Sequence, residues 1–144
     1  MGEPGSRPCR ACGCPLVFAE GPNGKQIPLD EQLVVTRARA DFLAMLEYAG
    51  RDDEGNPFAL RELDRFAWTW VERCWEEGAS AGLMLPTGSG KTTSVAWRIA
   101  WEIGRNPNLL ASLVCASYED ACDRVVLVRQ ILDLPRYRRV FPDV

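Results

Sequence analysis

Apolar residues recur along this chain with the three- and four-residue spacing of amphipathic helices. The spacing predicts four helices, at residues 36–49, 60–76, 91–103 and 117–132. In each helix the recurring residues form a stripe that we expect to be buried against a neighbouring element. The stripes comprise Ala38, Phe42, Met45 and Ala49; Leu63, Phe66, Ala67, Trp70, Val71 and Cys74; Val95, Ile99 and Ile103; and Ala121, Val125, Val128 and Leu132.

Two further apolar runs lack helical spacing and have the length of strands. Residues 83–85 precede a glycine-rich turn, and residues 109–116 follow the third predicted helix. A near-continuous apolar run is typical of a strand that is buried on both faces of a parallel sheet. Strand, turn, helix and strand in this order predict one right-handed βαβ unit.

The turn between the first run and the third helix has the composition of a phosphate-binding loop. Its residues are Thr87, Gly88, Ser89, Gly90, Lys91, Thr92 and Thr93. The two glycines allow backbone angles that direct successive N–H groups towards a polyphosphate. Lys91 is predicted to reach the β and γ phosphates, and Thr92 to bind the Mg²⁺ that bridges them. Leu85 stands where the strict G-x-x-x-x-G-K-[ST] pattern has its first glycine, so a plain glycine turn is the alternative.

The loop and the βαβ unit together predict an α/β fold, a P-loop NTPase core with a partial parallel sheet. Helices and a small cysteine-knuckle β-hairpin precede this core. A charged, turn-forming segment at residues 51–57 marks the boundary. The predicted organisation is a hairpin module at 1–35, a helix and linker at 36–57, and the N-terminal part of a P-loop ATPase domain at 58–144.

Three cysteines near the N-terminus form a candidate zinc site. Cys9, Cys12 and Cys14 precede β-prone residues and an Asn23-Gly24 turn. A C-x-x-C-G knuckle suits tetrahedral Zn²⁺ because its glycine frees backbone N–H groups that donate to the thiolates. A closed site needs four ligands, and this segment supplies three. Zinc binding and a metal-free hairpin are therefore both open.

Composition narrows the classes of function. The 144 residues contain no histidine, which excludes imidazole bases and His-containing zinc sites. The formal net charge of −3 gives no global attraction to DNA, so any DNA contact is local. The basic segment 135–142 is either such a contact or a solvated turn. We expect a cytoplasmic protein without membrane contact, because no run approaches the roughly 20 apolar residues of a membrane span and no signal peptide is recognisable.

Aromatic residues upstream of the loop offer a surface for a nucleotide base. The residues just before a phosphate loop often border the adenine of the bound nucleotide. Phe58 or Phe66 could stack on that base, and packing in the core is the other role open to them.

From Leu85 to its end, the sequence resembles the ATPase domain of bacteriophage terminase large subunits. The match covers roughly residues 58–144. The N-terminal hairpin is similar to small C-x-x-C hairpins of other phage proteins. The features that carry the resemblance are Leu85-Pro86 before the loop, Trp101 with Gly104-Arg105-Asn106-Pro107, Ala116-Ser117-Tyr118, and the closing segment Pro135-Arg136-Tyr137-Arg138-Arg139-Val140-Phe141-Pro142.

The resemblance implies an ATP-driven motor for viral genome packaging, with ATP and Mg²⁺ as cofactors and Lys91 as a catalytic residue. It implies double-stranded DNA, a terminase small subunit and the portal or procapsid as partners, a homo-oligomeric motor, and the bacterial host cytoplasm as its location. Hydrolysis needs a second acidic motif on another strand, and nothing after Leu132 supplies one. We therefore expect an N-terminal piece of the motor, with turnover dependent on further sequence.

Two other functions stay open. Many terminases carry an arginine and a histidine inside the loop, whereas Thr87-Gly88-Ser89 resembles the loop of superfamily-2 helicases, so a fragment of a helicase-like DNA translocase is one alternative. No glutamine lies between Leu60 and Leu85 to contact adenine, which counts against it. The other alternative is a small non-catalytic protein that binds nucleotide or resembles a zinc ribbon, and whose hairpin binds a partner.

Overall fold

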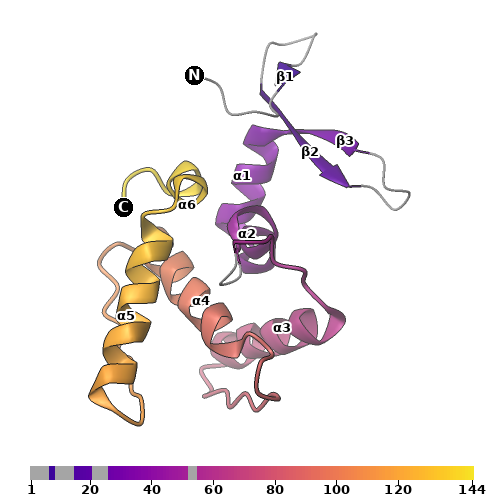
Figure 1. Ribbon diagram of the computed structural model, residues 1–144. Coiled ribbons are helices and arrows are strands. Elements are labelled where there is room, and N and C mark those ends of the chain that lie inside the picture. Colours follow the sequence, from indigo (N-terminus) through magenta and orange to yellow (C-terminus); the bar gives the residue numbers. More distant parts are fainter. Residues whose placement is uncertain (1–6, 9–14, 21–25, 52–54) are drawn as a thin grey trace.

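The computed structural model describes residues 7–8, 15–20, 26–51 and 55–144, with side chains from residue 31 onward. Cys9, Cys12 and Cys14, together with the predicted turn at Asn23-Gly24, lie outside these ranges. The elements in chain order are β1 (Arg7–Pro8), β2 (Pro15–Glu20), β3 (Gln26–Asp30), α1 (Glu31–Ala40), α2 (Phe42–Ala49), α3 (Glu62–Glu76), α4 (Lys91–Arg105), α5 (Tyr118–Leu132) and α6 (Pro135–Val140) (Figure 1).

The strands form one antiparallel sheet, which lies beyond the N-terminal end of α1 (Figure 1). Its strand order is β1-β2-β3. The register of β2 and β3 runs from Leu16 opposite Asp30 to Glu20 opposite Gln26, so these two strands pair as the hairpin prediction requires. Helix α1 begins at Glu31, directly after β3, and this joins the sheet to the helical part of the chain.

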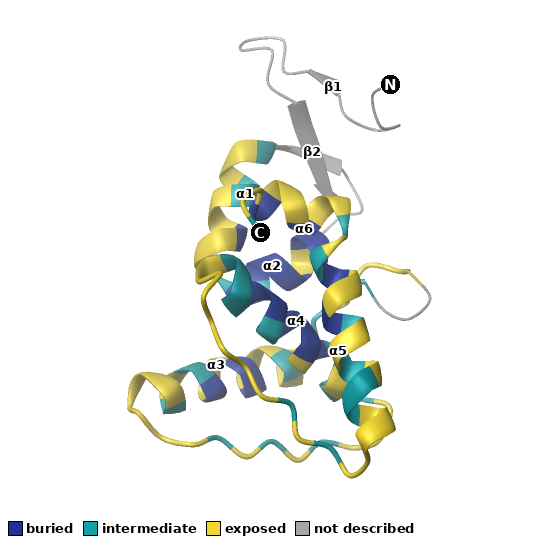
Figure 2. Cartoon of the chain, turned by 90° about the vertical axis from the view of Figure 1, so that its left-hand side faces the viewer, coloured by how far each residue is buried: buried dark blue, intermediate teal, exposed yellow. Residues whose placement is uncertain are grey.

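The helices enclose one apolar core with α2 at its centre (Figure 2). The Phe42 ring meets Trp68 of α3 edge-on, with 4.9 Å between centroids, and lies 5.9 Å from the Trp101 ring of α4. The indole Nε1 of Trp101 donates a 2.9 Å hydrogen bond to the Ala38 carbonyl of α1. Through Phe42 and Trp101 these contacts join α1, α2, α3 and α4. The large side chains that are fully buried are Phe42, Met45, Leu46, Trp97, Trp101, Tyr137 and Val140.

The predicted helix at 36–49 is in fact two helices, which meet at Asp41. Its backbone is extended (φ −130°, ψ 120°), and its side chain accepts hydrogen bonds from the N–H groups of Leu43 and Ala44, at 2.9 and 3.4 Å. Aspartate is among the strongest N-capping residues. The apolar spacing runs through the break without interruption, so the spacing alone could not reveal it.

The predicted α/β class is wrong. Within the described residues the only sheet is the antiparallel one, and neither 83–85 nor 109–116 forms a strand. Both segments lack regular secondary structure, and their most exposed apolar residues are Met84 at 96 %, Leu110 at 97 % and Val114 at 93 %. The parallel sheet and the βαβ unit of the predicted P-loop core are therefore absent from this part of the chain.

The packing of α4 explains why no parallel sheet forms. In a βαβ unit the crossover helix buries its apolar stripe on the sheet, and a parallel sheet needs cover on both faces. The buried side chains of α4 instead join the helical core, where α4 contacts α2 and α5. Trp97 and Trp101 are buried in this core, whereas Val95 of the predicted stripe is 39 % exposed, so α4 leaves the two apolar runs uncovered. The buried residues of α4 are Ser94, Ala96, Trp97, Arg98, Ala100 and Trp101.

The stripe predicted at 36–49 is buried, whereas the stripes predicted for the three later helices are rotated relative to the faces that are buried. In α3 the buried residues are Ala67, Trp68 and Val71, whereas Phe66 is 73 % exposed. In α5 they are Val128 and Ile131, and Val125 is exposed. Gly104, the residue after the predicted helix at 91–103, lies inside α4. A Cβ there would come within 2.4 Å of the Phe141 ring, so the glycine permits close packing of the C-terminal segment.

The basic segment 135–142 forms α6 and the turn after it, and its arginines bind other parts of the chain. Arg136 donates to the Tyr48 carbonyl at 3.1 Å, Arg138 pairs with Asp133 at 2.9 Å, and Arg139 pairs with Glu31 at 3.0 Å. These contacts connect α6 to α1, α2 and the end of α5. Of the two alternatives for this segment, the structure shows a helix with Tyr137 and Val140 buried in place of a solvated turn, and the DNA contact is untested.

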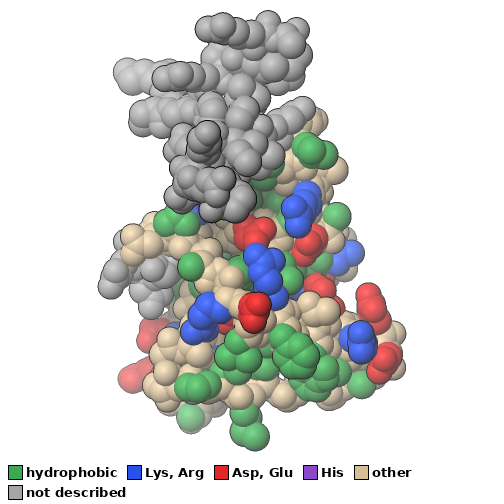
Figure 3. All heavy atoms as spheres, turned by 90° about the vertical axis from the view of Figure 1, so that its right-hand side faces the viewer, with side chains coloured by type: hydrophobic (Ala, Val, Ile, Leu, Met, Phe, Trp, Pro, Cys, Tyr) green, Lys and Arg blue, Asp and Glu red, His purple; other side chains and the backbone are tan. Residues whose placement is uncertain are grey.

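Charge is mixed on the surface. Figure 3 shows acidic and basic side chains interspersed on one face, with hydrophobic side chains gathered below them. Such a face has no large area of a single sign that would attract a polyanion over a distance. Among the described helices, none is both long and apolar enough to cross a membrane.

Candidate phosphate-binding site

The glycine turn before α4 is built as a loop that faces the helix N-terminus. Gly88 and Gly90 have φ values of 79° and 77°, in the left-handed region that residues with a Cβ rarely adopt. The Ser89 N–H donates to the Pro86 carbonyl at 3.3 Å, which closes the turn. Gly90 is the N-cap of α4, and its carbonyl accepts the first helical bond, from the Ser94 N–H at 2.9 Å.

Three backbone donors at the start of α4 are therefore directed out of the helix. The N–H groups of Lys91, Thr92 and Thr93 precede the first i to i−4 bond and have no partner within the helix. Together with the positive end of the helix dipole, such donors favour an anion. A loop that presents backbone donors beside a lysine has the chemistry needed to bind phosphate.

The Lys91 side chain folds back over the loop. Its Nζ donates to the carbonyl oxygens of Leu85 and Pro86, at 2.5 and 2.7 Å, and lies 3.4 Å from the Ser89 hydroxyl. These partners lie within the turn or in the two residues just before it, so the ammonium group is held against the loop. A lysine in this position can exchange its carbonyl partners for phosphate oxygens without leaving the loop.

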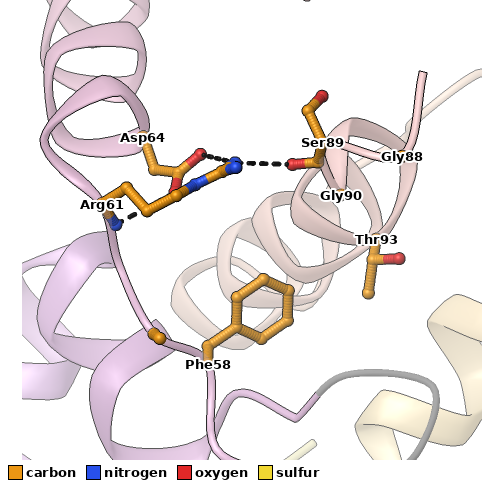
Figure 4. Close-up of a pocket in the computed structure, with 8 residues that line it drawn as sticks. Phe58, Arg61, Asp64, Gly88, Ser89, Gly90 and Thr93 are labelled. Atoms are coloured by element: carbon orange, nitrogen blue, oxygen red, sulfur yellow. Dashed lines mark hydrogen bonds and ion pairs between the residues drawn. The ribbon is translucent and has the colours of Figure 1, made fainter. Parts of the chain in front are cut away.

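A cleft of about 360 Å³ adjoins the loop (Figure 4). One wall is formed by the loop and the first turn of α4. The other wall comes from the segment that leads into α3, where the Phe58 ring lies 4.0 Å from the position a Cβ would take on Gly90. Segments about thirty residues apart in sequence thus meet at the site. The lining residues are Phe58, Ala59, Arg61, Asp64, Gly88, Ser89, Gly90 and Thr93.

Arg61 and Asp64 form a charged pair in this cleft. The guanidinium makes a two-pronged contact with the carboxylate, Nε to Oδ2 at 2.9 Å and NH2 to Oδ1 at 3.0 Å. The NH2 group also donates to the Ser89 carbonyl at 3.0 Å, which ties the start of α3 to the loop. The hydrogen bond from Arg61 lowers the pKa of Asp64, and the same bond raises the pKa of Arg61. Both groups are therefore charged at neutral pH.

The hydroxyl of Thr92 is the candidate Mg²⁺ ligand. Thr92 is exposed in the first turn of α4, next to Lys91. Mg²⁺ in nucleotide sites keeps several waters and takes most of its other ligands from the substrate phosphates, so one hydroxyl beside an anion-binding loop fits such an ion. No group of three His, Cys, Asp or Glu side chains in the described part of the chain could hold a metal by itself. The zinc prediction concerns Cys9, Cys12 and Cys14, which lie outside that part.

Most of the predicted loop residues come together at the site. Gly88, Ser89, Gly90 and Thr93 line the cleft, and Lys91 covers the loop. Thr87 and Thr92 are exposed beside it. Of the two aromatic candidates for the base, Phe58 lines the cleft and Phe66 does not.

Comparison with protein-family models, with curated proteins and with solved structures finds no match for this chain. The description of the site therefore rests on the geometry of this chain alone. Its boundaries are the loop, the lysine across it and the cleft beside it.

Sequence reasoning missed Arg61 and Asp64. A local signal was present, because Asp64 is the third residue of α3 and its carboxylate accepts a 3.1 Å bond from the Arg61 backbone N–H, as in a capping box. That signal marks the start of a helix and says nothing about a contact with residue 89. Only the folded chain brings the pair to the loop.

Proposed function

We propose that residues 87–93 bind the polyphosphate of ATP together with Mg²⁺. The observation that supports this most strongly is the combination of two left-handed glycines, a helix N-terminus and a lysine whose Nζ lies across the same turn. A plain glycine turn has no need for an ammonium group held against it. Each of these features favours an anion, and they converge on one loop.

The residues of the chain have separate roles in this proposal. The N–H groups of the loop and of the first turn of α4 donate to the phosphates, and Lys91 transfers its Nζ bonds from two backbone carbonyls to the β and γ phosphates. Thr92 contributes its hydroxyl to the Mg²⁺, which neutralises phosphate charge when bound. The base occupies the cleft and stacks on Phe58, at a ring that already borders the loop.

For the biological role, we propose the ATP-binding N-terminal portion of a phage terminase large subunit. The support is the resemblance of roughly residues 58–144 to that family. In this role Lys91 also assists turnover, and the partners are double-stranded DNA, the terminase small subunit, the portal or procapsid and further copies of the motor chain. The place of action is the cytoplasm of the bacterial host.

A second candidate function is nucleotide binding without hydrolysis. The observation that favours it is the state of Asp64, the one carboxylate among the described residues that line the cleft. Its oxygens accept hydrogen bonds from the Arg61 side chain and backbone. An acid engaged in this way is poorly suited to orient an attacking water.

Mg-ATP binding and turnover by the purified chain test the proposal. We expect binding that Lys91→Ala abolishes and that Lys25→Ala, which removes the only other lysine, leaves intact. Turnover that is lost in Lys91→Ala would support the motor and exclude the second candidate. Binding without turnover fits both, because the motor is expected to need further sequence for hydrolysis. Equal ATP affinity of the Lys91→Ala variant and the wild type would overturn the assignment of the site.

A further inference from the structure

Arg61 reaches the phosphate loop from a different part of the chain. Its NH2 group lies 3.0 Å from the Ser89 carbonyl, across 28 positions of sequence, and its side chain is 55 % exposed. The guanidinium is therefore beside the loop and also accessible to a ligand. It lines the same cleft as Gly88 and Gly90 (Figure 4).

Both partners of Arg61 are hydrogen-bond acceptors, and acceptors of this kind repel the oxygens of a bound phosphate. The Asp64 carboxylate carries a full negative charge, and the Ser89 carbonyl presents the negative end of its dipole. Without a cation between them and the loop, these two groups would repel an anion at that edge of the site. The guanidinium lies beside both groups and makes the electrostatic potential at this edge of the site favourable to an anion.

Arg61 also has donors left for a ligand. A guanidinium carries five N–H donors. Its Nε and NH2 groups make all the side-chain contacts given above, and its NH1 group has no hydrogen-bond partner among the described residues. A planar fork with unused donors is well suited to a phosphate group.

We propose that Arg61 is a second phosphate-binding residue of this site, which acts with Lys91 on the polyphosphate of the nucleotide. The inference rests on the proposed function. Asp64 and the Ser89 carbonyl both position the guanidinium, and the Ser89 contact keeps it at the loop when the carboxylate is replaced. The phosphate loop itself contains one cationic side chain, Lys91, and the arginine arrives from the start of α3.

The fold allows Arg61 to be tested without removing the helix cap. The hydrogen bond that caps α3 comes from the backbone N–H of Arg61, which an alanine keeps. The side chain is exposed, so its truncation leaves no cavity in the core. Arg65, one turn further along α3, pairs with Glu47 and does not line the cleft, which makes Arg65→Ala the matched control.

The experiment uses two probes, Mg-ATP and magnesium tripolyphosphate, which has the phosphates but neither base nor ribose. Affinities are measured by calorimetry for the wild type, Arg61→Ala and Arg65→Ala, with circular dichroism as the check on folding. We expect Arg61→Ala to lower the affinity for both probes by about tenfold or more, because a charge-assisted contact is lost. We expect Arg65→Ala to stay within about twofold of the wild type for both probes.

A second pair of variants separates phosphate binding from neutralisation of Asp64. The Asp64→Asn variant has no carboxylate for the arginine to neutralise. Adding Arg61→Ala to it should still lower the affinity for tripolyphosphate by about tenfold. If Arg61→Ala has no effect in that background, the arginine only screens Asp64 and the inference is overturned. A loss confined to ATP, with tripolyphosphate unchanged, would also overturn it.

The outcomes distinguish this inference from the function on which it rests. If the wild type binds both probes, Lys91→Ala abolishes binding and Arg61→Ala changes nothing, the inference alone fails. If the wild type binds neither probe, or if Lys91→Ala binds as well as the wild type, the proposed function fails and the inference fails with it.

Discussion

The apolar residues within α4 and those of the two segments on either side of the loop and helix differ in how far they are buried. Within α4, Trp97 and Trp101 are 2 % exposed, whereas Met84 before the loop and Leu110 after the helix are 96 % and 97 % exposed. Both sets are strongly hydrophobic. They differ in their partners: the tryptophans meet a core centred on Phe42, and the two segments pair with no strand among the described residues.

This difference divides α4 into a fixed end and an open end. Towards its C-terminus, Ala100, Trp101 and Gly104 are held by Tyr137, Ala38 and Phe141. At its N-terminus the helix meets a glycine turn and a cleft. A site that can accept a ligand at one end of a helix requires that the other end be held rigidly. The core therefore positions the loop, although none of its buried aromatic rings lines the cleft.

The largest effect is expected at the fixed end, from Trp101→Ala. The change removes a buried ring that packs on Phe42 and a 2.9 Å hydrogen bond to the Ala38 carbonyl. We expect the free energy of unfolding to fall by about 3–5 kcal/mol. Urea denaturation followed by circular dichroism measures it, and a loss below about 1 kcal/mol would show that α4 is not fixed by this core.

An intermediate effect with a defined pH dependence is expected from Tyr137→Phe. The Tyr137 hydroxyl donates a 2.7 Å bond to the Ala100 carbonyl, worth about 1 kcal/mol. Burial raises the pKa of Tyr137 to about 12, whereas the phenol titrates near pH 10 in an unfolded chain. Above about pH 10 the unfolded state loses this proton while the folded state keeps it, so the stabilisation is complete below that pH and declines above it.

The measurement for Tyr137 compares the two proteins across that interval. The difference in free energy of unfolding between the wild type and Tyr137→Phe should be constant from pH 7 to about 9 and shrink towards about pH 11. The variant is the control for every other group that titrates there. A difference that stays constant up to about pH 11 would contradict the burial of this hydroxyl.

The smallest effect is expected at the open end, from Met84→Ala. The side chain is 96 % exposed, so we expect a change within about 0.5 kcal/mol. If Met84 lay in a buried strand of a parallel sheet, the same change would lower the free energy of unfolding by about 2–5 kcal/mol. The same denaturation assay as for Trp101→Ala therefore sharpens the comparison, and a loss in that larger range would restore the strand at residues 83–85.

Periodic features of this chain were predictable from sequence, and features that depend on distant partners were not. The apolar spacing in 91–103 predicted the helix that became α4, and the glycines and Lys91 predicted the loop before it. The spacing missed the break at Asp41, because a capping bond leaves the apolar pattern unchanged. The strand predictions at 83–85 and 109–116 were wrong, because a continuous apolar run becomes a buried strand only where neighbouring strands and helices cover it.

The candidate site shows the same limit. The residues on the loop were predictable because their chemistry is local to one turn. Arg61 and Asp64 were not, because their contact with Ser89 joins positions 28 residues apart. Phe58 was one of two aromatic candidates, and only the approach of its ring to Gly90 separates it from the exposed Phe66.

The central claim is that a polyphosphate binds in the loop at the open end of α4. Backbone amide chemical shifts of the isotope-labelled chain, followed during addition of Mg-ATP, test it most directly. We expect the largest changes at Gly88, Ser89, Gly90, Lys91 and Thr92, where backbone donors face the ligand, and none of these changes in Lys91→Ala. Changes that are largest elsewhere, or that persist in Lys91→Ala, would contradict the claim.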